Sequence, residues 1–255
     1  MSDPVKLLEP LADPSAANET IAAAVKGFND QAKAAAAESE SSVECYVWDA
    51  FGKLFDVVGR TPPEHQGKLL DFSAELQQTT VTDADGKPLK ISGFGKLWED
   101  MPQFGMIVRD LWNFDVDDAS ATAEERAKWA NWVAFLAQLT ARSEERDVEA
   151  FDFSLIALWD LRCAFEEGRS QVSETAVKLA ALWLLFAGKR LRKLSADDHK
   201  FDAKLGVARG DYSEREWKGF NEQRWEAWKH ELKAAQDKLG PDETFQAAVA
   251  LIEKL

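Results

Sequence analysis

Apolar residues recur every three or four positions along most of the chain, and this spacing predicts helices. The clearest case begins at Asn221, a good helix N-cap because its side-chain oxygen can accept a first-turn N–H. Gly240 and Pro241 then end the predicted helix. The apolar stripe, with steps of 3, 4, 3 and 4 residues, consists of Trp225, Trp228, Leu232, Ala235 and Leu239.

Arg224 lies at the edge of this predicted apolar stripe, about 40° around the helix from Trp228 at ~100° per residue. A guanidinium group in that place must keep its donors satisfied, because burying an unpaired charge costs several kcal/mol. We therefore expect a carboxylate or several backbone carbonyls within reach of Arg224. Glu166 and Asp160 are the candidate carboxylates.

Two stretches, residues 148–167 and 173–187, are apolar nearly all round. A helix with this pattern is a buried one. Gly168 ends the first stretch and Ser173 can cap the second. The sequence therefore predicts a buried antiparallel helix pair at the centre of the fold.

The remaining segments complete an all-α prediction. Residues 1–14 contain three prolines and are predicted to form a flexible N-terminal arm, whereas residues 15–255 are predicted to form a single irregular multi-helix domain. Residues 79–97 are the one long irregular segment, rich in turn residues. We find no strand-like alternation of useful length and no fixed-period repeat.

Composition and charge limit the function classes. The net charge is −14, which argues against nucleic acid or an anionic membrane as the main partner. Cys45 and Cys163 offer no disulfide framework and no zinc spacing. The N-terminus lacks the pattern of a secretion signal, and the longest apolar run, residues 180–187, is too short to span a bilayer. We expect a soluble, cytoplasmic protein.

The chain resembles a fungal family of all-helical proteins of unknown function, over roughly residues 45–255. This resemblance implies a cytosolic helical protein and supplies no catalytic residues. Asn221 stands where the family often has serine or threonine, and each of these residues can cap a helix. The stretches that carry the resemblance are LWEDMP (97–102), RDLW (109–112), WANWVAFLA (129–137), LRCAFE (161–166) and GFNEQRWEAW (219–228).

Few residues suggest catalytic chemistry. The three histidines are far apart in sequence, and we find no phosphate-binding glycine loop and no nucleophile elbow. The acidic runs at 83–86 and 115–118 lack the further ligands that a calcium or magnesium site needs. We therefore predict no metal, no cofactor and no catalytic residue. The basic run at 189–193 fits a helix C-terminus or, alternatively, a patch for an anionic ligand or acidic partner.

Two hypotheses for the function remain open. The first is a non-catalytic helical scaffold that binds a protein partner or a small ligand. The second is an enzyme of fungal secondary metabolism, an isomerase or cyclase, working in a pocket walled by some of the ten tryptophans. A closed, dry core would favour the scaffold, and a pocket with convergent charges would favour the enzyme. The candidate ligand-binding residues are Trp98, Arg109, Trp112, Arg224, Trp225 and Trp228.

Overall fold

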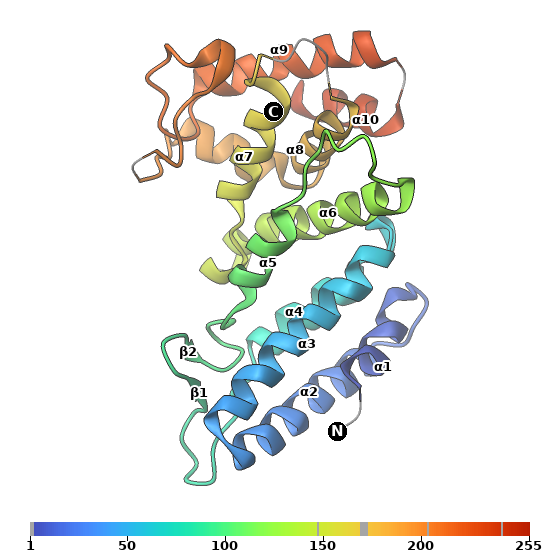
Figure 1. Ribbon diagram of the computed structural model, residues 1–255, viewed down its shortest axis with the longest axis vertical. Helices are drawn as coiled ribbons and strands as arrows, with labels where there is room; N and C mark the ends of the chain where they lie inside the picture. Colours follow the sequence, from blue (N-terminus) through green and yellow to red (C-terminus); the bar gives the residue numbers. More distant parts are fainter. Residues whose placement is uncertain (1–2, 147, 169–172, 203, 241) are drawn as a thin grey trace. The chain divides into compact units, whose positions relative to one another are not determined.

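The fold is predominantly α-helical, as the sequence predicts (Figure 1). The computed structural model describes residues 3–146, 148–168, 173–202, 204–240 and 242–255. These described residues divide between two compact units, Met1–Phe114 and Asp115–Leu255. None of the helices in the described ranges is both long enough and apolar enough to cross a bilayer.

The first unit holds five α-helices and a two-stranded antiparallel ladder within its described residues. Lys90 pairs with Lys96 and Ile91 with Gly95 in this ladder, which lies in the segment that the sequence analysis expects to be irregular. The elements are α1 (Pro4–Leu8), the 3-10 helix η1 (Glu9–Ala12), α2 (Glu19–Glu38), α3 (Glu40–Arg60), η2 (Pro63–His65), α4 (Gly67–Gln77), β1 (Lys90–Ile91), β2 (Gly95–Lys96) and α5 (Phe104–Trp112).

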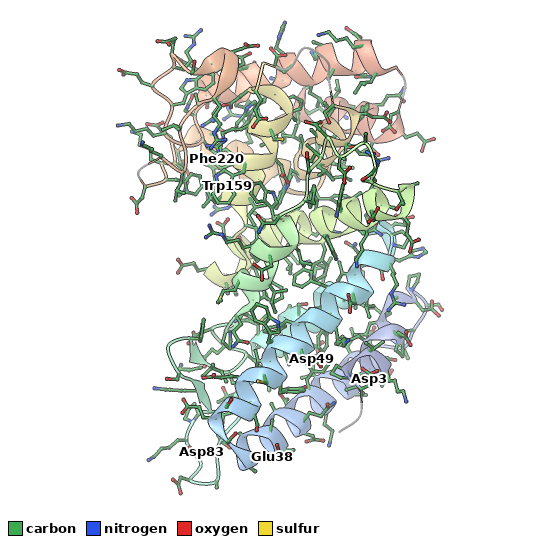
Figure 2. The ribbon with its side chains drawn as sticks, viewed as in Figure 1. Asp3, Glu38, Asp49, Asp83, Trp159 and Phe220 are labelled. Carbon is green, nitrogen blue, oxygen red and sulfur yellow. The ribbon has the colours of Figure 1, made fainter. Side chains whose placement is uncertain are left out.

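The N-terminal segment differs from the predicted arm, because residues 4–12 are helical and partly buried. Asp3, labelled in Figure 2, lies at the start of α1 and caps it. Its side chain accepts a hydrogen bond from the backbone N–H of Val5 at 3.0 Å. Leu8 and Leu11 are fully buried. Proline is well tolerated in the first turn of a helix. The prolines of this segment therefore start helical turns, and the leucines between them anchor those turns.

The core of the first unit is built around Trp98, which is fully buried. The rings of Phe28, Tyr46 and Phe51 surround it, with centroids 5.6–6.4 Å from its own. The indole N–H of Trp98 donates to Oδ1 of Asn29 at 2.8 Å. This bond satisfies the one polar atom of the side chain.

The second unit is organised around α8, which packs against α6, α7, α9 and α10. The predicted contact between the two apolar stretches is present as the packing of α7 on α8. Trp183 of α8 is fully buried, and its indole N–H donates to Asp160 of α7 at 2.6 Å. The elements are α6 (Ala123–Arg146), η3 (Glu149–Phe151), α7 (Ser154–Phe165), α8 (Glu174–Ala196), η4 (Gly210–Tyr212), α9 (Glu222–Leu239) and α10 (Glu243–Ile252).

The prediction of a single domain over residues 15–255 can be tested by scanning calorimetry. A single domain should unfold in one transition, with the calorimetric enthalpy equal to the van't Hoff enthalpy. Two resolved transitions would contradict it and would show that the two compact units unfold separately.

Candidate functional site

The predicted helix after Asn221 is present as α9, and its cap is the predicted one. The side-chain oxygen of Asn221 accepts a hydrogen bond from the backbone N–H of Arg224 at 2.9 Å. Asn221 itself has extended backbone dihedrals, as an N-cap residue should. The buried face of α9 contains Arg224 together with Trp225, Trp228, Leu232 and Ala235.

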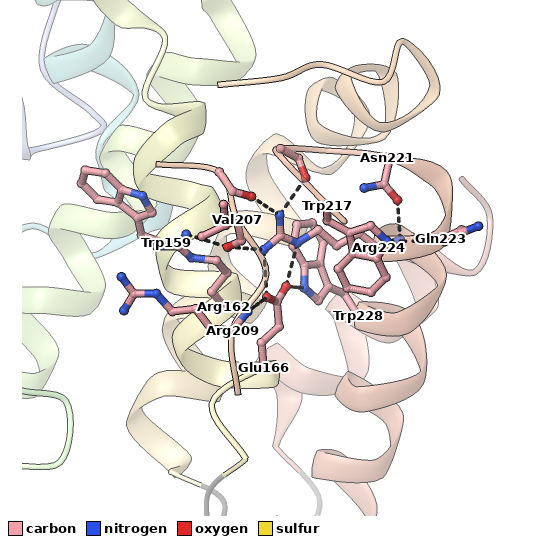
Figure 3. A network of polar contacts seen from close by, with 12 residues as sticks. Trp159, Arg162, Glu166, Val207, Arg209, Trp217, Asn221, Gln223, Arg224 and Trp228 are labelled. Carbon is pink, nitrogen blue, oxygen red and sulfur yellow. Dashed lines mark hydrogen bonds and ion pairs between the residues drawn. The ribbon is translucent and has the colours of Figure 1, made fainter. Parts of the chain in front are cut away.

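Arg224 and Glu166 form a bidentate ion pair inside the second unit (Figure 3). Nε of Arg224 donates to Oε1 of Glu166 at 2.7 Å, and Nη2 donates to Oε2 at 2.8 Å. Both side chains have an exposed fraction of 0%. Two parallel bonds from one edge of a guanidinium group are the strongest geometry available to such a pair.

Backbone carbonyls occupy the other donors of Arg224. Nη1 donates to the carbonyls of Gly206 at 2.7 Å and Gly219 at 2.8 Å, and Nη2 also approaches that of Val207 at 3.4 Å. The guanidinium carbon lies 5.5 Å and 5.3 Å from the ring centroids of Trp217 and Trp228. The expectation of a carboxylate and several carbonyls around Arg224 is therefore confirmed.

The carboxylate of Glu166 is equally well satisfied. Its Oε1 also accepts the indole N–H of Trp228 at 2.9 Å, and its Oε2 also accepts the backbone N–H of Arg209 at 3.2 Å. With the two bonds from Arg224, this carboxylate accepts from four donors. The ion pair therefore ties the end of α7, the start of α9 and the irregular segment 205–219 together, and leaves no group for a substrate.

Glycines allow the irregular segment to approach its neighbours this closely. A Cβ atom on Gly219 would collide with the backbone oxygen of His199, and one on Gly206 would collide with that of Lys218. In both cases the obstacle is backbone, which cannot swing aside. The sequence analysis places Gly219 outside the cap of α9, and the structure adds that close approach is what requires a glycine there.

Arg162 does not pair with Glu166, although the two are four residues apart. Its Nη1 instead donates to the carbonyls of Leu205 at 2.8 Å and Val207 at 3.0 Å. Trp159 shares the first of these acceptors, because its indole N–H also donates to the Leu205 carbonyl, at 3.1 Å. Burial, with added repulsion from Arg209 and Arg224, lowers the pKa of Arg162 to about 10.

A surface pocket of about 620 Å³, here called the Trp217 pocket, lies where this segment meets α8 and α9. The ring of Trp217 stacks on that of Tyr212, with centroids 5.3 Å apart. The hydroxyl of Tyr212 donates to Glu231 at 2.9 Å, and burial raises the pKa of Tyr212 to about 12. The pocket is lined by Ser195, Ala196, Asp198, Lys200, Glu214, Arg215, Glu216, Trp217, Lys218, Asn221, Glu222 and Gln223.

Comparison with known families agrees with the resemblance in one respect, a family of unknown function. A family profile described as "Protein of unknown function (DUF3632)" matches residues 48–232, which include Arg162, Glu166 and Arg224. The chain belongs to the DUF3632 family. No curated protein and no solved structure matches it. The family description names no activity, so the function has to be inferred from the site itself.

The candidate ligand-binding residues fall in both units of this DUF3632 member. In the first unit Trp98 is buried, Trp112 is half-buried and Arg109 is exposed on α5. In the second, Arg224 contacts Trp228, whereas the indole N–H of Trp225 is buried without a partner. Trp217 lines the pocket and was not among the predicted site residues, because it lies outside any helical stripe in the sequence.

The basic run of α8 is partly used in ion pairs. Arg190 pairs with Asp152 at 2.9 Å, and Arg192 pairs with Glu222 at 2.8 Å. Arg192 is therefore partly engaged in an ion pair, whereas Lys189 is exposed and serves as a control below. Among the residues that the structure describes, no cluster of three His, Cys, Asp or Glu side chains could hold a metal ion.

We predict that Arg224→Ala lowers the free energy of unfolding by about 3–5 kcal/mol, because the buried carboxylate of Glu166 loses its partner. Urea denaturation followed by tryptophan fluorescence measures this change. Lys189→Ala, on the exposed face of α8, should change the same free energy by less than about 0.5 kcal/mol. Equal stability of Arg224→Ala and the wild type would contradict the assigned role.

A double-mutant cycle separates the pair from its surroundings. Glu166→Gln combined with Arg224→Met removes both charges, so the loss should be clearly smaller than the sum of the two single losses. Simple additivity would show that the two side chains stabilise the unit independently.

Proposed function

We propose that the protein is a non-catalytic binding module that receives a segment of a partner protein in the Trp217 pocket. The observation that carries this proposal is the pocket itself, about 620 Å³ in volume and walled by three separate parts of the second unit. A pocket of this size can hold several side chains of a partner.

The buried ion pair supports the proposal because it fixes one wall of the pocket. Arg224 holds the backbone at Gly206 and Gly219, and Lys200 forms an isolated bridge with Gly219. Asn221 and Gln223, which line the pocket, come shortly before Arg224 in the sequence. A wall that is already fixed lowers the ordering cost of binding.

The charges of the pocket favour a polypeptide. Its lining alternates acidic and basic side chains, among them Glu214, Arg215, Glu216 and Lys218. A mixed set of charges fixes the register of a partner that carries the complementary pattern. A nucleic acid would need a predominantly basic surface, and the whole chain carries a charge of −14.

No specific observation favours the enzyme hypothesis. Its buried arginine and carboxylate, Arg224 and Glu166, are fully buried and bonded to each other. A catalytic acid, base or charge has to reach the reacting group of a substrate.

The cytoplasmic location and the fungal origin implied by the resemblance are part of the same proposal.

Affinity capture with a matched pair of charge-reversal variants tests the proposal. Arg215→Glu with Lys218→Glu should weaken partner binding about tenfold or more, because like charges then face each other in the pocket. The double variant Lys178→Glu, Lys189→Glu makes the same change of charge at exposed positions of α8. It should bind the partner as strongly as the wild type does. Quantitative mass spectrometry of the captured proteins measures both.

A partner retained equally by both variants would place the binding surface elsewhere and overturn the proposal. A photo-crosslinking amino acid in place of Glu216, which lines the pocket, tests the position of the partner independently. It should form a crosslink to the same partner. The same residue at Lys178 should not.

A further inference from the structure

Arg162 is a buried cation whose Nε–H group has no hydrogen-bond partner in the part of the chain that the structure describes. The residue is 5% exposed. Its Nη1 is fully used by two carbonyls, whereas its Nε is buried without any partner. Both hydrogen bonds that the Arg162 side chain donates to described residues come from Nη1. Nε and Nη2 form the edge of a guanidinium group that carries two parallel N–H bonds.

Arg224 shows what this edge does when it is occupied. Its Nη1 also donates to two carbonyls, while its Nε and Nη2 hold the two oxygens of Glu166 at 2.7 and 2.8 Å. The two arginines therefore share one bonding pattern at Nη1, but Nε of Arg162 has no carboxylate partner among the described residues. Both contact the carbonyl of Val207, so the two patterns occur on the same stretch of backbone.

The local charge balance also favours an anion. Arg162, Arg209 and Arg224 lie within electrostatic range of one another, three cations against the carboxylates of Glu166 and Glu167, and the carboxylate of Glu166 is bonded to Arg224 (Figure 3). The lowered pKa of Arg162 means that its charged form costs folding free energy at neutral pH. A bound anion would recover that cost, since buried charges in proteins are normally paired.

We propose that the Nε/Nη2 edge of Arg162 binds the carboxylate of a small organic acid. This site is separate from the Trp217 pocket and goes beyond the function proposed above. A planar carboxylate matches two parallel N–H donors. A small acid with a single charge is favoured over a polyanion, because the chain as a whole carries a charge of −14.

The neighbours of Arg162 suggest the rest of the ligand. The half-buried indole of Trp159 shares the Leu205 carbonyl with Arg162 and so lies beside the guanidinium group. An aromatic acid could place its ring against this indole. Since Nε has no exposed surface, the acid enters only when a neighbouring side chain moves. Arg209 is exposed and close enough to repel Arg162, so it can move aside and still add its charge.

The test uses the full-length protein, with benzoate and inorganic phosphate as probes and chloride to hold the ionic strength constant. The side-chain Nε–H resonance of Arg162, identified by its loss in Arg162→Lys, is followed in ¹H–¹⁵N spectra. Benzoate should shift this resonance saturably at millimolar concentration, and the melting temperature should rise in the same range. Phosphate should have no more effect than chloride.

Arg162→Lys is the informative variant, because lysine keeps the charge and loses the two parallel donors. It should weaken benzoate binding about tenfold or more. Arg60→Lys, which alters an exposed arginine of the first unit, should leave benzoate binding unchanged.

Three results would overturn the proposal. They are an Arg162 resonance that benzoate does not move, equal benzoate binding by wild type and Arg162→Lys, and a response to phosphate stronger than that to benzoate. If Arg162→Lys fails to fold, the Nε–H resonance of Arg162 is assigned instead by its shift in Trp159→Phe. The benzoate titration of the wild-type protein then decides the question. Loss of benzoate binding would leave the capture experiment on the Trp217 pocket unaffected, so the two proposals fail separately.

Discussion

The second unit depends on one buried ion pair, that of Arg224 with Glu166. Burying either charge alone, away from water, would cost several kcal/mol of folding free energy. The cost is offset because the two charges pair with each other and both have a full set of hydrogen bonds. Four donors converge on the carboxylate, and carbonyls of an irregular segment take the remaining N–H groups of the arginine. The pair thereby converts a stretch with little regular structure into a fixed wall. Both proposed binding sites adjoin that wall.

Much of this arrangement follows from sequence patterns of short range. The cap at Asn221, the stripe of α9 and the need of Arg224 for partners can all be read from residues that are neighbours on one helix. Glu166 is one of the two carboxylates that the sequence offers Arg224, but the particular carbonyls of Gly206 and Gly219 could not be read in the same way, because backbone carbonyls leave no signature in side-chain identity. Arg162 and Glu166 are four residues apart, a spacing at which oppositely charged side chains on a helix often pair. However, Glu166 is the C-cap residue just beyond α7, and there it meets Arg224 from a segment 58 residues further along the chain.

The tryptophans illustrate the same limit for the candidate site. Their number predicts a core rich in indole, and Trp98, Trp183, Trp225 and Trp228 are indeed among the largest fully buried side chains. Helical periodicity cannot tell whether such a residue fills a core or borders a pocket. Trp217 borders one, and it lies between η4 and α9 where no period applies. The division into two compact units is equally hidden from local patterns, since it depends on contacts between distant helices.

The long separation of Glu166 and Arg224 has a consequence for the order of folding. Closing a loop of 58 residues carries an entropic cost that only the finished contact offsets. During synthesis α7 leaves the ribosome well before α9, so the carboxylate of Glu166 must stay hydrated until its partner arrives. Tight packing of the second unit therefore has to be a late event, which waits for one particular arginine near the end of the chain.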